Sequence, residues 1–179
     1  MTSDGRGRRR RRIWLALGSN LDDREAHLRA AVAGLRADGI EVDRVSSLYE
    51  TPPWGVVRQP AFLNAAVSGL TDLDARDLLI LAKRLEAAEG RDFRAPRWTA
   101  RPLDIDIALI EGETVDRTDL QVPHVLLGQR SFVLVPLAEV GGDVIHPQTG
   151  LRIASMRDLR PALERAEVVR VRGPEWAEG

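Results

Sequence analysis

The sequence predicts a single α+β domain, in which an antiparallel sheet carries helices on one face and leaves the other face free to bind a ligand. Three observations support this fold class. The 179 residues, of which 44% are hydrophobic, fit one domain. Short apolar runs of strand character alternate with two segments of helical periodicity. There is no cysteine, and no apolar run approaches the length of a membrane span. We therefore expect a cytoplasmic protein without disulfides, Cys-ligated metals or a membrane partner.

The first two elements are a strand and a helix. Ile13 to Leu17 is apolar and ends at a Gly-Ser-Asn turn, which is typical of a buried strand. Asp22 and Glu25 then have the spacing of a capping box, and Gly39 supplies a helix stop. The apolar face of this helix consists of Leu28, Ala31, Val32 and Leu35.

Two further strands follow, separated by a loop. Ile40 to Tyr49 has strand composition, and its alternation slips near Arg44, which predicts a bulge. Thr51 to Pro60 contains three prolines and is expected to be an ordered loop, because proline disfavours helix and central strand. Phe62 to Leu70 is the next strand.

A second helix and a last strand complete the pattern. Asp74 caps a helix that ends at Gly90, and we expect the basic segment Arg91 to Arg101 to be a mobile loop. Leu103 to Ile110 is a strand, and Ser131 to Val140 is expected to be a short helix. The apolar stripe of the second helix consists of Leu78, Leu79, Ala82 and Leu85. The order β-α-β-β-α-β predicts a ferredoxin-like sandwich.

The N-terminal residues differ from the rest of the chain in charge. Residues 1–12 contain six arginines and one acid, whereas the whole chain has a formal net charge of −1. Because this segment has no apolar face to bury, we expect residues 1–12 to be a disordered extension and residues 13–179 to form the domain. A nucleic-acid-binding arm is the alternative, but no aromatic residue is interleaved with the arginines.

Two carboxylates on the last strand suggest a metal site. Asp104 and Asp106 are two residues apart, so they share one face of the strand, at ~6–7 Å between Cα atoms. This arrangement suits one or two magnesium ions. A solvated strand face is the alternative, but the same face is expected to continue with Ala108 and Ile110 and so to pass from charge into core.

Basic residues surround these acids in the sequence, and guanidinium groups bind phosphate oxygens bidentately. They are Arg84, Arg91, Arg94, Arg97, Arg101 and Arg130. Acids for magnesium and arginines for phosphate are the composition of a nucleoside triphosphate site built without a P-loop. A solvated basic surface is the alternative. His124 either donates a hydrogen bond to phosphate or is an ordinary loop histidine.

Phe62 and Asn64 share a face of their strand. A flat ring can stack on the phenyl group while the amide bonds the edge of that ring. From these residues alone, a core phenylalanine beside a hydrogen-bonded asparagine is the simpler interpretation.

Several motifs then occur in a fixed order along the chain. They are Gly18-Ser19-Asn20-Leu21, Thr51-Pro52-Pro53, Phe62-Leu63-Asn64-Ala65-Ala66-Val67, Glu86 with Gly90-Arg91, Arg97-Trp98 with Arg101, Leu103-Asp104-Ile105-Asp106, and Val122-Pro123-His124 with Arg130. In this order they resemble the motifs of the 6-hydroxymethyl-7,8-dihydropterin pyrophosphokinase family of folate biosynthesis. The resemblance covers residues 13 to 160.

The resemblance implies a reaction: transfer of the β,γ-pyrophosphoryl unit of ATP to the pterin hydroxymethyl oxygen, giving the pterin diphosphate and AMP. It implies two magnesium ions, held by Asp104 and Asp106, which act in catalysis with Arg91 and Arg101. The implied ATP contacts are Glu86, Arg91, Trp98, Arg101, His124 and Arg130. The implied pterin pocket consists of Thr51, Pro52, Phe62, Asn64 and Phe132, with the ring held between the two phenyl groups. We expect the partners to be ATP and a reduced pterin, and the protein to be a monomer that binds no nucleic acid.

The chain departs from the family pattern in the basic loop. Phe93 stands where a second arginine is expected, and Arg94 beside it is the candidate replacement. Thr99, Ala100 and Pro102 replace the usual residues around Arg101.

A second hypothesis, from a different functional class, is a non-catalytic nucleotide- or RNA-binding module on the same fold. An RNA-binding sheet needs exposed aromatic residues on its central strands, and Phe62 is the only obvious candidate. The enzyme is therefore the favoured interpretation.

Overall fold

A computed structural model describes residues 10–53, 58–96 and 99–178 of the chain. The main sheet consists of β1 (Arg11–Ser19), β2 (Glu41–Val45), β3 (Leu48–Thr51), β4 (Phe62–Thr71), β5 (Asp104–Ile110) and β8 (Val169–Arg172). The helices are α1 (Arg24–Ala37), α2 (Ala75–Ala88), α3 (Ser131–Gly141), α4 (Ile153–Asp158) and α5 (Ala162–Ala166), with 3-10 turns η1 (Leu127–Gln129) and η2 (Pro174–Glu178). A separate hairpin pairs β6 (Val115–Asp116) with β7 (Gln121–Val122). Within the described ranges, no helix is long and apolar enough to span a bilayer.

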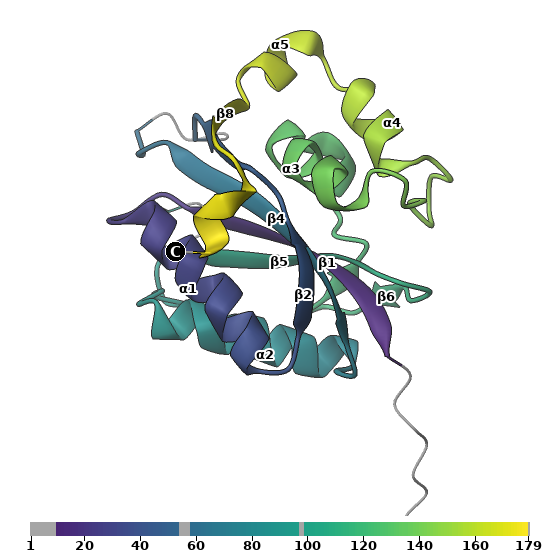
Figure 1. Cartoon of the computed structure of the whole chain (residues 1–179), viewed down its shortest axis with the longest axis horizontal. Coiled ribbons are helices and arrows are strands. Elements are labelled where there is room, and N and C mark those ends of the chain that lie inside the picture. The colour runs from purple at the N-terminus through teal and green to yellow at the C-terminus, as the bar shows by residue number, and fades with distance from the viewer. Residues whose placement is uncertain (1–9, 54–57, 97–98, 179) are drawn as a thin grey trace, which may run out of the picture.

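The main sheet is antiparallel and has the order β5-β1-β4-β3-β8, with β2 also paired to β4. β1 therefore lies between β5, which carries the predicted carboxylates, and β4, which carries Phe62 and Asn64. Figure 1 shows α1 and α2 on one side of this sheet and α3 and α4 on the other. This topology confirms the ferredoxin-like arrangement that the β-α-β-β-α-β order predicted.

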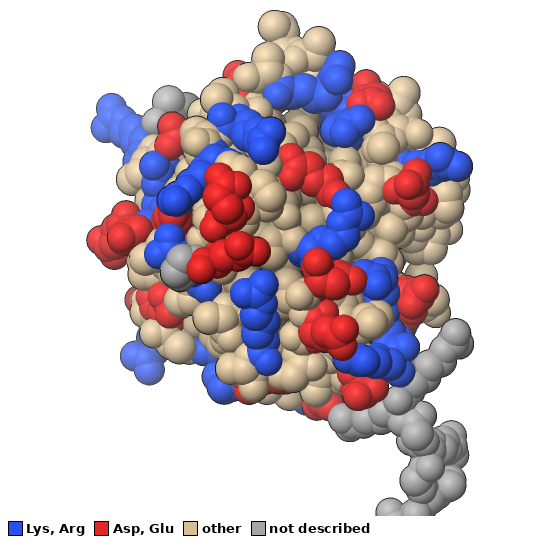
Figure 2. All heavy atoms as spheres, viewed as in Figure 1, with Lys and Arg blue, Asp and Glu red and all other residues tan. Residues whose placement is uncertain are grey.

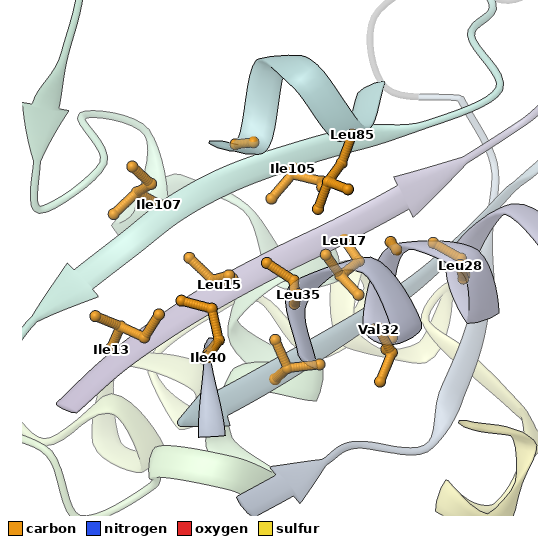
Figure 3. Packing of buried hydrophobic residues seen from close by; sticks show 14 of the residues in the cluster. Ile13, Leu15, Leu17, Leu28, Val32, Leu35, Ile40, Leu85, Ile105 and Ile107 are labelled. Carbon is orange, nitrogen blue, oxygen red and sulfur yellow. The ribbon is translucent and has the colours of Figure 1, made fainter. Parts of the chain in front are cut away.

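The larger core lies between the sheet and helices α1 and α2. Leu28, Val32 and Leu35 of α1 lie together with Leu15 of β1 and Ile105 of β5 (Figure 3). Each of these side chains is at most 2% exposed. Burial of one such side chain stabilises the fold by ~1.5–3 kcal/mol, so this layer accounts for much of the driving force for folding.

Both long helices begin at an aspartate cap. The Asp74 side chain accepts a hydrogen bond from the Asp77 N–H at 2.9 Å, as predicted. In α1 the cap is Asp23, which accepts from the Ala26 N–H at 3.0 Å, so the expected cap at Asp22 is one residue early. Asp22 instead adopts a positive φ of 52°, which turns the chain from β1 into the helix.

The opposite face of the sheet is not free, which corrects the expectation of helices on one face only. Leu134 and Leu137 of α3 are fully buried in a second core with Trp14, Ala16 and Ala66. The small alanine side chains on the strands allow α3 to approach closely, and α4 packs against its other side. Only one end of this face therefore stays available for a ligand.

An irregularity between β1 and β5 decides which residues face this second core. The pairing register shifts between Trp14 and Leu15. As a result Ile110 packs in the core beneath α1 and α2, whereas Ala108 packs in the second core. The expectation that Asp104, Ala108 and Ile110 share one face is therefore wrong for Ile110, because a bulge reverses the alternation.

The N-terminal arginines are not all part of an extension. Arg11 and Arg12 lie in β1, so the expected boundary of the disordered segment at residue 12 is wrong for these two residues. Ion pairs join Arg10 to Glu41, Arg11 to Glu113 and Arg12 to Asp43. Carboxylates from β2 and from the turn after β5 attract the arginines, and this long-range pairing could not be inferred from composition. Residues 1–9 lie outside the described residues.

The C-terminal segment returns to the sheet, which was not expected from the sequence. β8 pairs with β3 and lies at the edge of the sheet. The fully buried Trp176 of η2 donates its indole N–H to the Ser46 carbonyl at 2.8 Å. Ser46 and Ser47 interrupt the strand expected over Ile40 to Tyr49, which is therefore two strands, β2 and β3. The bulge predicted near Arg44 is confirmed by a register shift beside it.

Candidate active site

A pocket of about 450 Å³ opens at the polar ends of β1, β4 and β5, beside the second core. Its lining includes residues from the first and the last of the sequence motifs, Gly18 and Arg130. Every residue predicted for the catalytic, ATP and pterin sites lines it except Glu86 and Trp98, and Trp98 lies outside the described residues. Of the wider basic cluster, Arg84 and Arg94 are not among the described residues that line the pocket, and Arg97 lies outside the described residues. The pocket therefore assembles the residues that the sequence motifs singled out, including pairs separated by more than half of the chain.

The β5 carboxylates lie on the pocket side of the strand, opposite Gly18 and Ala16 of β1. Asp104 accepts hydrogen bonds from Arg91 and, at 3.2 Å, from Arg101. Burial raises the pKa of Asp104, but the positive charges of Arg101 and Arg91 outweigh this and lower it. The two arginines thus hold Asp104 ionised at neutral pH.

Asp106 has the opposite balance. Burial raises its pKa, and the neighbouring charge of Asp104 raises it further. The His124 ring lies beside it, with Nε2 at 3.9 Å from Oδ2, and the positive charge of Arg130 lowers the pKa of Asp106. Two carboxylates on one strand face form a donor set suited to a hard divalent cation.

Magnesium fits this donor set in a particular way. Among the described residues there is no cluster of three or more His, Cys, Asp or Glu side chains able to enclose a metal ion. Magnesium usually takes one or two carboxylates and completes its octahedron with water and substrate phosphates. Asp104 and Asp106 therefore fit a magnesium site that is completed by a nucleotide.

Glu86 lies behind the pocket rather than in its wall. Its carboxylate is fully buried, accepts from the Ile105 N–H at 2.8 Å, and lies 2.8 Å from Arg91 and 2.9 Å from Lys83. Burial raises the pKa of Glu86, and the bond from Lys83 opposes that shift. In this position Glu86 orients two cations of the pocket.

His124 and Arg130 approach Asp106 from the segment between β7 and α3. The His124 Nδ1 accepts from the Leu126 N–H at 3.2 Å, which directs Nε2 towards the carboxylate. Arg130 is 8% exposed and immediately precedes α3. Its guanidinium carbon lies 5.6 Å from the centre of the Phe132 ring. The two ATP contacts predicted on this side thus lie around Asp106, as Arg91 and Arg101 lie around Asp104.

The other end of the pocket is flat and apolar, with one buried polar pair. The Asn64 amide donates to the Thr51 hydroxyl at 2.8 Å, and both side chains are buried. Phe62 and Phe132 line the pocket from β4 and α3. Gly18 keeps this end open, because a Cβ there would lie 3.4 Å from the Asn64 Oδ1 and 3.7 Å from the Phe62 ring. The geometry suits a planar heterocycle with polar edges.

Two residues of this region were not among the predicted site residues, although Asn20 belongs to the first motif of the series. Asn20 is fully buried, accepts from the Arg101 N–H at 2.7 Å, and donates to Gln59 and to the Pro60 carbonyl. It thereby joins the arginine side of the pocket to the loop on the aromatic side. Lys83 lines the pocket from α2. Its rarity was a signal that could have found it, since it is the only lysine in the chain.

Comparison with known proteins agrees with this geometry. The family model described as 7,8-dihydro-6-hydroxymethylpterin-pyrophosphokinase (HPPK) matches residues 14–142. The 2-amino-4-hydroxy-6-hydroxymethyldihydropteridine pyrophosphokinase of Methylorubrum extorquens is 43% identical over 157 residues, which cover 87% of this chain and 99% of that protein. The protein of the same name from Bacillus subtilis is 45% identical over 128 residues, covering 71% of this chain and 76% of that protein.

A solved structure supports the fold. The Plasmodium falciparum HPPK-DHPS wild type with pteroate superposes with a TM-score of 0.70 at 13% identity. The match covers 84% of this chain and 44% of that chain, so this chain spans less than half of the length of that protein. The family match and the two bacterial relatives confirm the resemblance inferred from the motifs, and the chain belongs to the 7,8-dihydro-6-hydroxymethylpterin-pyrophosphokinase family.

Proposed function

We propose how this ATP-dependent pyrophosphokinase of folate biosynthesis uses its pocket. ATP binds at the end formed by Arg91, Arg101, His124 and Arg130, and 6-hydroxymethyl-7,8-dihydropterin binds at the end formed by Phe62, Asn64 and Phe132. One observation carries the proposal: a single pocket joins a charged end to a flat apolar end across the β5 carboxylates. These are the requirements of a reaction between a polyphosphate and a planar heterocycle.

Asp104 and Asp106 hold two magnesium ions in this proposal. When bound, magnesium neutralises phosphate oxygens and stabilises the charge of the transferring group. The raised pKa of Asp106 supports this role, because a cation offsets the repulsion from Asp104 that raises it. Asp104 keeps its own arginines, so it is already ionised when magnesium and ATP arrive.

The chain acts mainly by positioning and by charge. The pterin hydroxymethyl oxygen forms a bond to the β-phosphorus while the bond from that phosphorus to the α,β-bridging oxygen breaks. AMP leaves with the bridging oxygen, and the hydroxyl proton passes to solvent. Arg91 and Arg101, fixed by Glu86 and by Asn20, place guanidinium groups beside the transferring phosphates. This scheme requires no protein nucleophile.

On the pterin side, the ring stacks between Phe62 and Phe132 while Asn64 bonds its polar edge. Thr51 supports this role, because its hydroxyl accepts one amide proton of Asn64 and so orients the side chain. Pro52 adds to the wall beside it. Aromatic stacking of this kind contributes ~0.5–1.5 kcal/mol beyond the area buried.

We further propose that the chain from the start of β1 at Arg11 onward forms one pyrophosphokinase domain that acts as a cytoplasmic monomer and binds no nucleic acid. The pairing of β8 with β3 supports a single domain, because it joins the C-terminal segment to the same sheet. Figure 2 shows basic and acidic side chains interspersed over the face in view, which lacks the one-signed surface of a nucleic-acid binder. This observation favours the enzyme over the RNA-binding module.

The test is direct. Purified protein is incubated with ATP, magnesium and the reduced pterin, and the nucleotides are separated by chromatography. We expect AMP and pterin diphosphate in equal amounts, with neither product when magnesium is removed by chelation. Formation of ADP in place of AMP, or release of AMP without the pterin, would contradict the proposed transfer.

A further inference from the structure

Lys83 is a pocket residue to which the scheme above gives no role. It lies on α2 and lines the pocket beside Arg91 and Phe93. Its side chain is 42% exposed, so the ammonium group is partly available to a ligand. Lys83 belongs to none of the sequence motifs and is not among the predicted ATP contacts.

Two neighbours hold the Lys83 side chain in place. Its Nζ donates to the Glu86 Oε2 at 2.9 Å, and Glu86 is fully buried. The same Nζ lies 5.8 Å from the centre of the Phe93 ring, within the range of a cation–π contact. An ammonium group has three N–H donors, so the bond to Glu86 leaves two for a further acceptor.

The charge of Lys83 reaches the proposed metal ligands. It lowers the pKa of both Asp104 and Asp106, although burial is the larger influence on each. Lys83 and both carboxylates also line the same pocket, so a phosphate chain held there would share this pocket with the ammonium group.

The basic loop lacks the arginine expected at residue 93, and Lys83 supplies a positive charge near that position. Arg94 was the candidate to replace the arginine expected at residue 93, but it is exposed and is not among the described residues that line the pocket. Phe93 does line the pocket, and two cations lie near its ring, with the Arg91 guanidinium carbon at 5.3 Å and the Lys83 Nζ at 5.8 Å from the ring centre. The extra positive charge at this point of the pocket thus comes from helix α2 rather than from the loop.

We propose that Lys83 is a further nucleotide-binding residue, whose ammonium group binds a phosphate oxygen of ATP while Glu86 and the Phe93 ring hold it in place. This inference rests on the proposed function, because it assumes that the nucleotide occupies the charged end of the pocket. Lys83 thereby distinguishes a nucleoside polyphosphate from an uncharged nucleoside.

Calorimetry without turnover tests this role. A non-hydrolysable ATP analogue with magnesium is titrated into the parent protein and into Lys83→Gln, Lys83→Arg and Arg84→Gln. We expect Kd to rise about tenfold in Lys83→Gln, the loss of one charge-assisted hydrogen bond, and to stay within about threefold of the parent in Lys83→Arg. Arg84→Gln is the matched control: it removes the same charge from the next residue of α2, where Arg84 is 58% exposed and pairs with Asp38. Its Kd should equal that of the parent.

Two further titrations separate direct contact from an effect through Glu86. Adenosine should bind the parent and Lys83→Gln equally, because it has no phosphate. Because Glu86 also holds Arg91, the double variant Glu86→Gln/Lys83→Gln is compared with Glu86→Gln alone. If Lys83 merely neutralises Glu86, these two variants should bind the analogue equally; if Lys83 binds phosphate, the double variant should bind it more weakly. Equal affinity of these two variants, equal weakening of adenosine, or an unchanged Kd in Lys83→Gln each overturns the proposal.

The two proposals fail in different ways. An absence of AMP formation by the parent protein would contradict the pyrophosphoryl transfer, whereas the analogue titration would still report whether Lys83 binds phosphate. Normal AMP formation with an unchanged Kd in Lys83→Gln would contradict only the role of Lys83.

Discussion

One face of the sheet has two ends with opposite chemistry. At one end Trp14 and Ala66 are buried under Leu134 of α3. At the other end, on β5 and β4, Asp106 and Asn64 face an open pocket. Apolar side chains at the first end gain stability by leaving water, whereas a carboxylate at the second end loses hydration when it is buried.

The difference shows in the electrostatics of the pocket end. Burial raises the pKa of Asp106 and of Glu86, so keeping either one ionised costs free energy. The buried Nε of Arg101 has no hydrogen-bond partner among the described residues. The covered end therefore stabilises the fold, and the pocket end uses part of that stability to hold charges for ATP and magnesium. Each prediction below separates these two contributions.

The largest effect is expected at Asp106. Asp106→Ala should lower turnover by about a thousandfold or more, because it removes a carboxylate from the proposed magnesium site. Asp106→Asn should be nearly as harmful, since charge matters more than shape there. The thermal midpoint without magnesium should stay equal or rise, because the substitution removes a desolvated charge. AMP formation and circular dichroism measure the two effects.

Asp104 is the informative control for Asp106. Asp104→Ala should lose activity to the same extent but should also lower the thermal midpoint, because Asp104 holds Arg91 and Arg101. A folded Asp106→Ala protein that makes AMP near the parent rate in saturating magnesium would contradict the metal role.

The covered end should respond in the opposite way. Leu134→Ala should lower the free energy of unfolding by ~2–5 kcal/mol, because it leaves a cavity beneath α3. At low temperature, where the variant stays folded, KM for ATP should change little. Urea unfolding and steady-state kinetics check this, with Leu163→Ala as control, since Leu163 is 83% exposed. A rise in KM as large as the loss of stability would show that the two ends are coupled.

The N-terminus offers a smaller test on the side away from the pocket. Removing residues 1–9 should leave stability and turnover unchanged, whereas removing residues 1–12 should lower the free energy of unfolding by ~1–2 kcal/mol. The longer deletion takes away two residues of β1 and the ion pairs of Arg10, Arg11 and Arg12. Urea unfolding of both truncated proteins gives the comparison. Equal stability of the two would show that these ion pairs and strand residues contribute nothing measurable.

The smallest effect concerns Tyr49, which joins β3 to α3 at the boundary between the two ends. Burial, followed by the hydrogen bond to Glu139 and its charge, raises the pKa of this phenol to about 12. A raised pKa stabilises the protonated form, so this contribution is complete below pH 10 and is lost as the pH rises from 10 towards 12. Tyr49 is the only tyrosine, so its phenolate absorbance can be followed without interference from another tyrosine.

We expect the absorbance midpoint near pH 12 in the folded protein and near pH 10 in urea. Tyr49→Phe should remove the dependence of stability on pH between these values while leaving the pocket intact. A midpoint near pH 10 in protein that circular dichroism shows to be folded would contradict burial of this phenol beside Glu139.

More of the candidate site than of the packing around it could be predicted from the sequence. Asp104 and Asp106 were identified from their alternation on one strand, which is a local property that one sequence displays. The same alternation placed Phe62 and Asn64 on one strand face, but only the family resemblance assigned them to a pterin pocket. Glu86 had a motif position but no orientation: the structure places it behind the pocket, because its charge is neutralised there by Arg91 and Lys83. The spacing of residues along the chain does not show whether a charged side chain such as Glu86 is buried or faces the pocket.

By itself, the sequence determined the order of the main elements from β1 to α3, apart from the division between β2 and β3 and the β6-β7 hairpin. It also determined the caps and stops of the long helices to within a residue, and the family. These follow from periodicity, turn residues and motif order, which depend on neighbours along the chain. Only the tertiary structure decided that α3 and α4 cover one end of the pocket face, that β8 pairs with β3, and that Lys83 lies beside Phe93. Those outcomes depend on strand register and on contacts between distant residues. A single bulge between Trp14 and Leu15 was enough to move Ile110 to the other core.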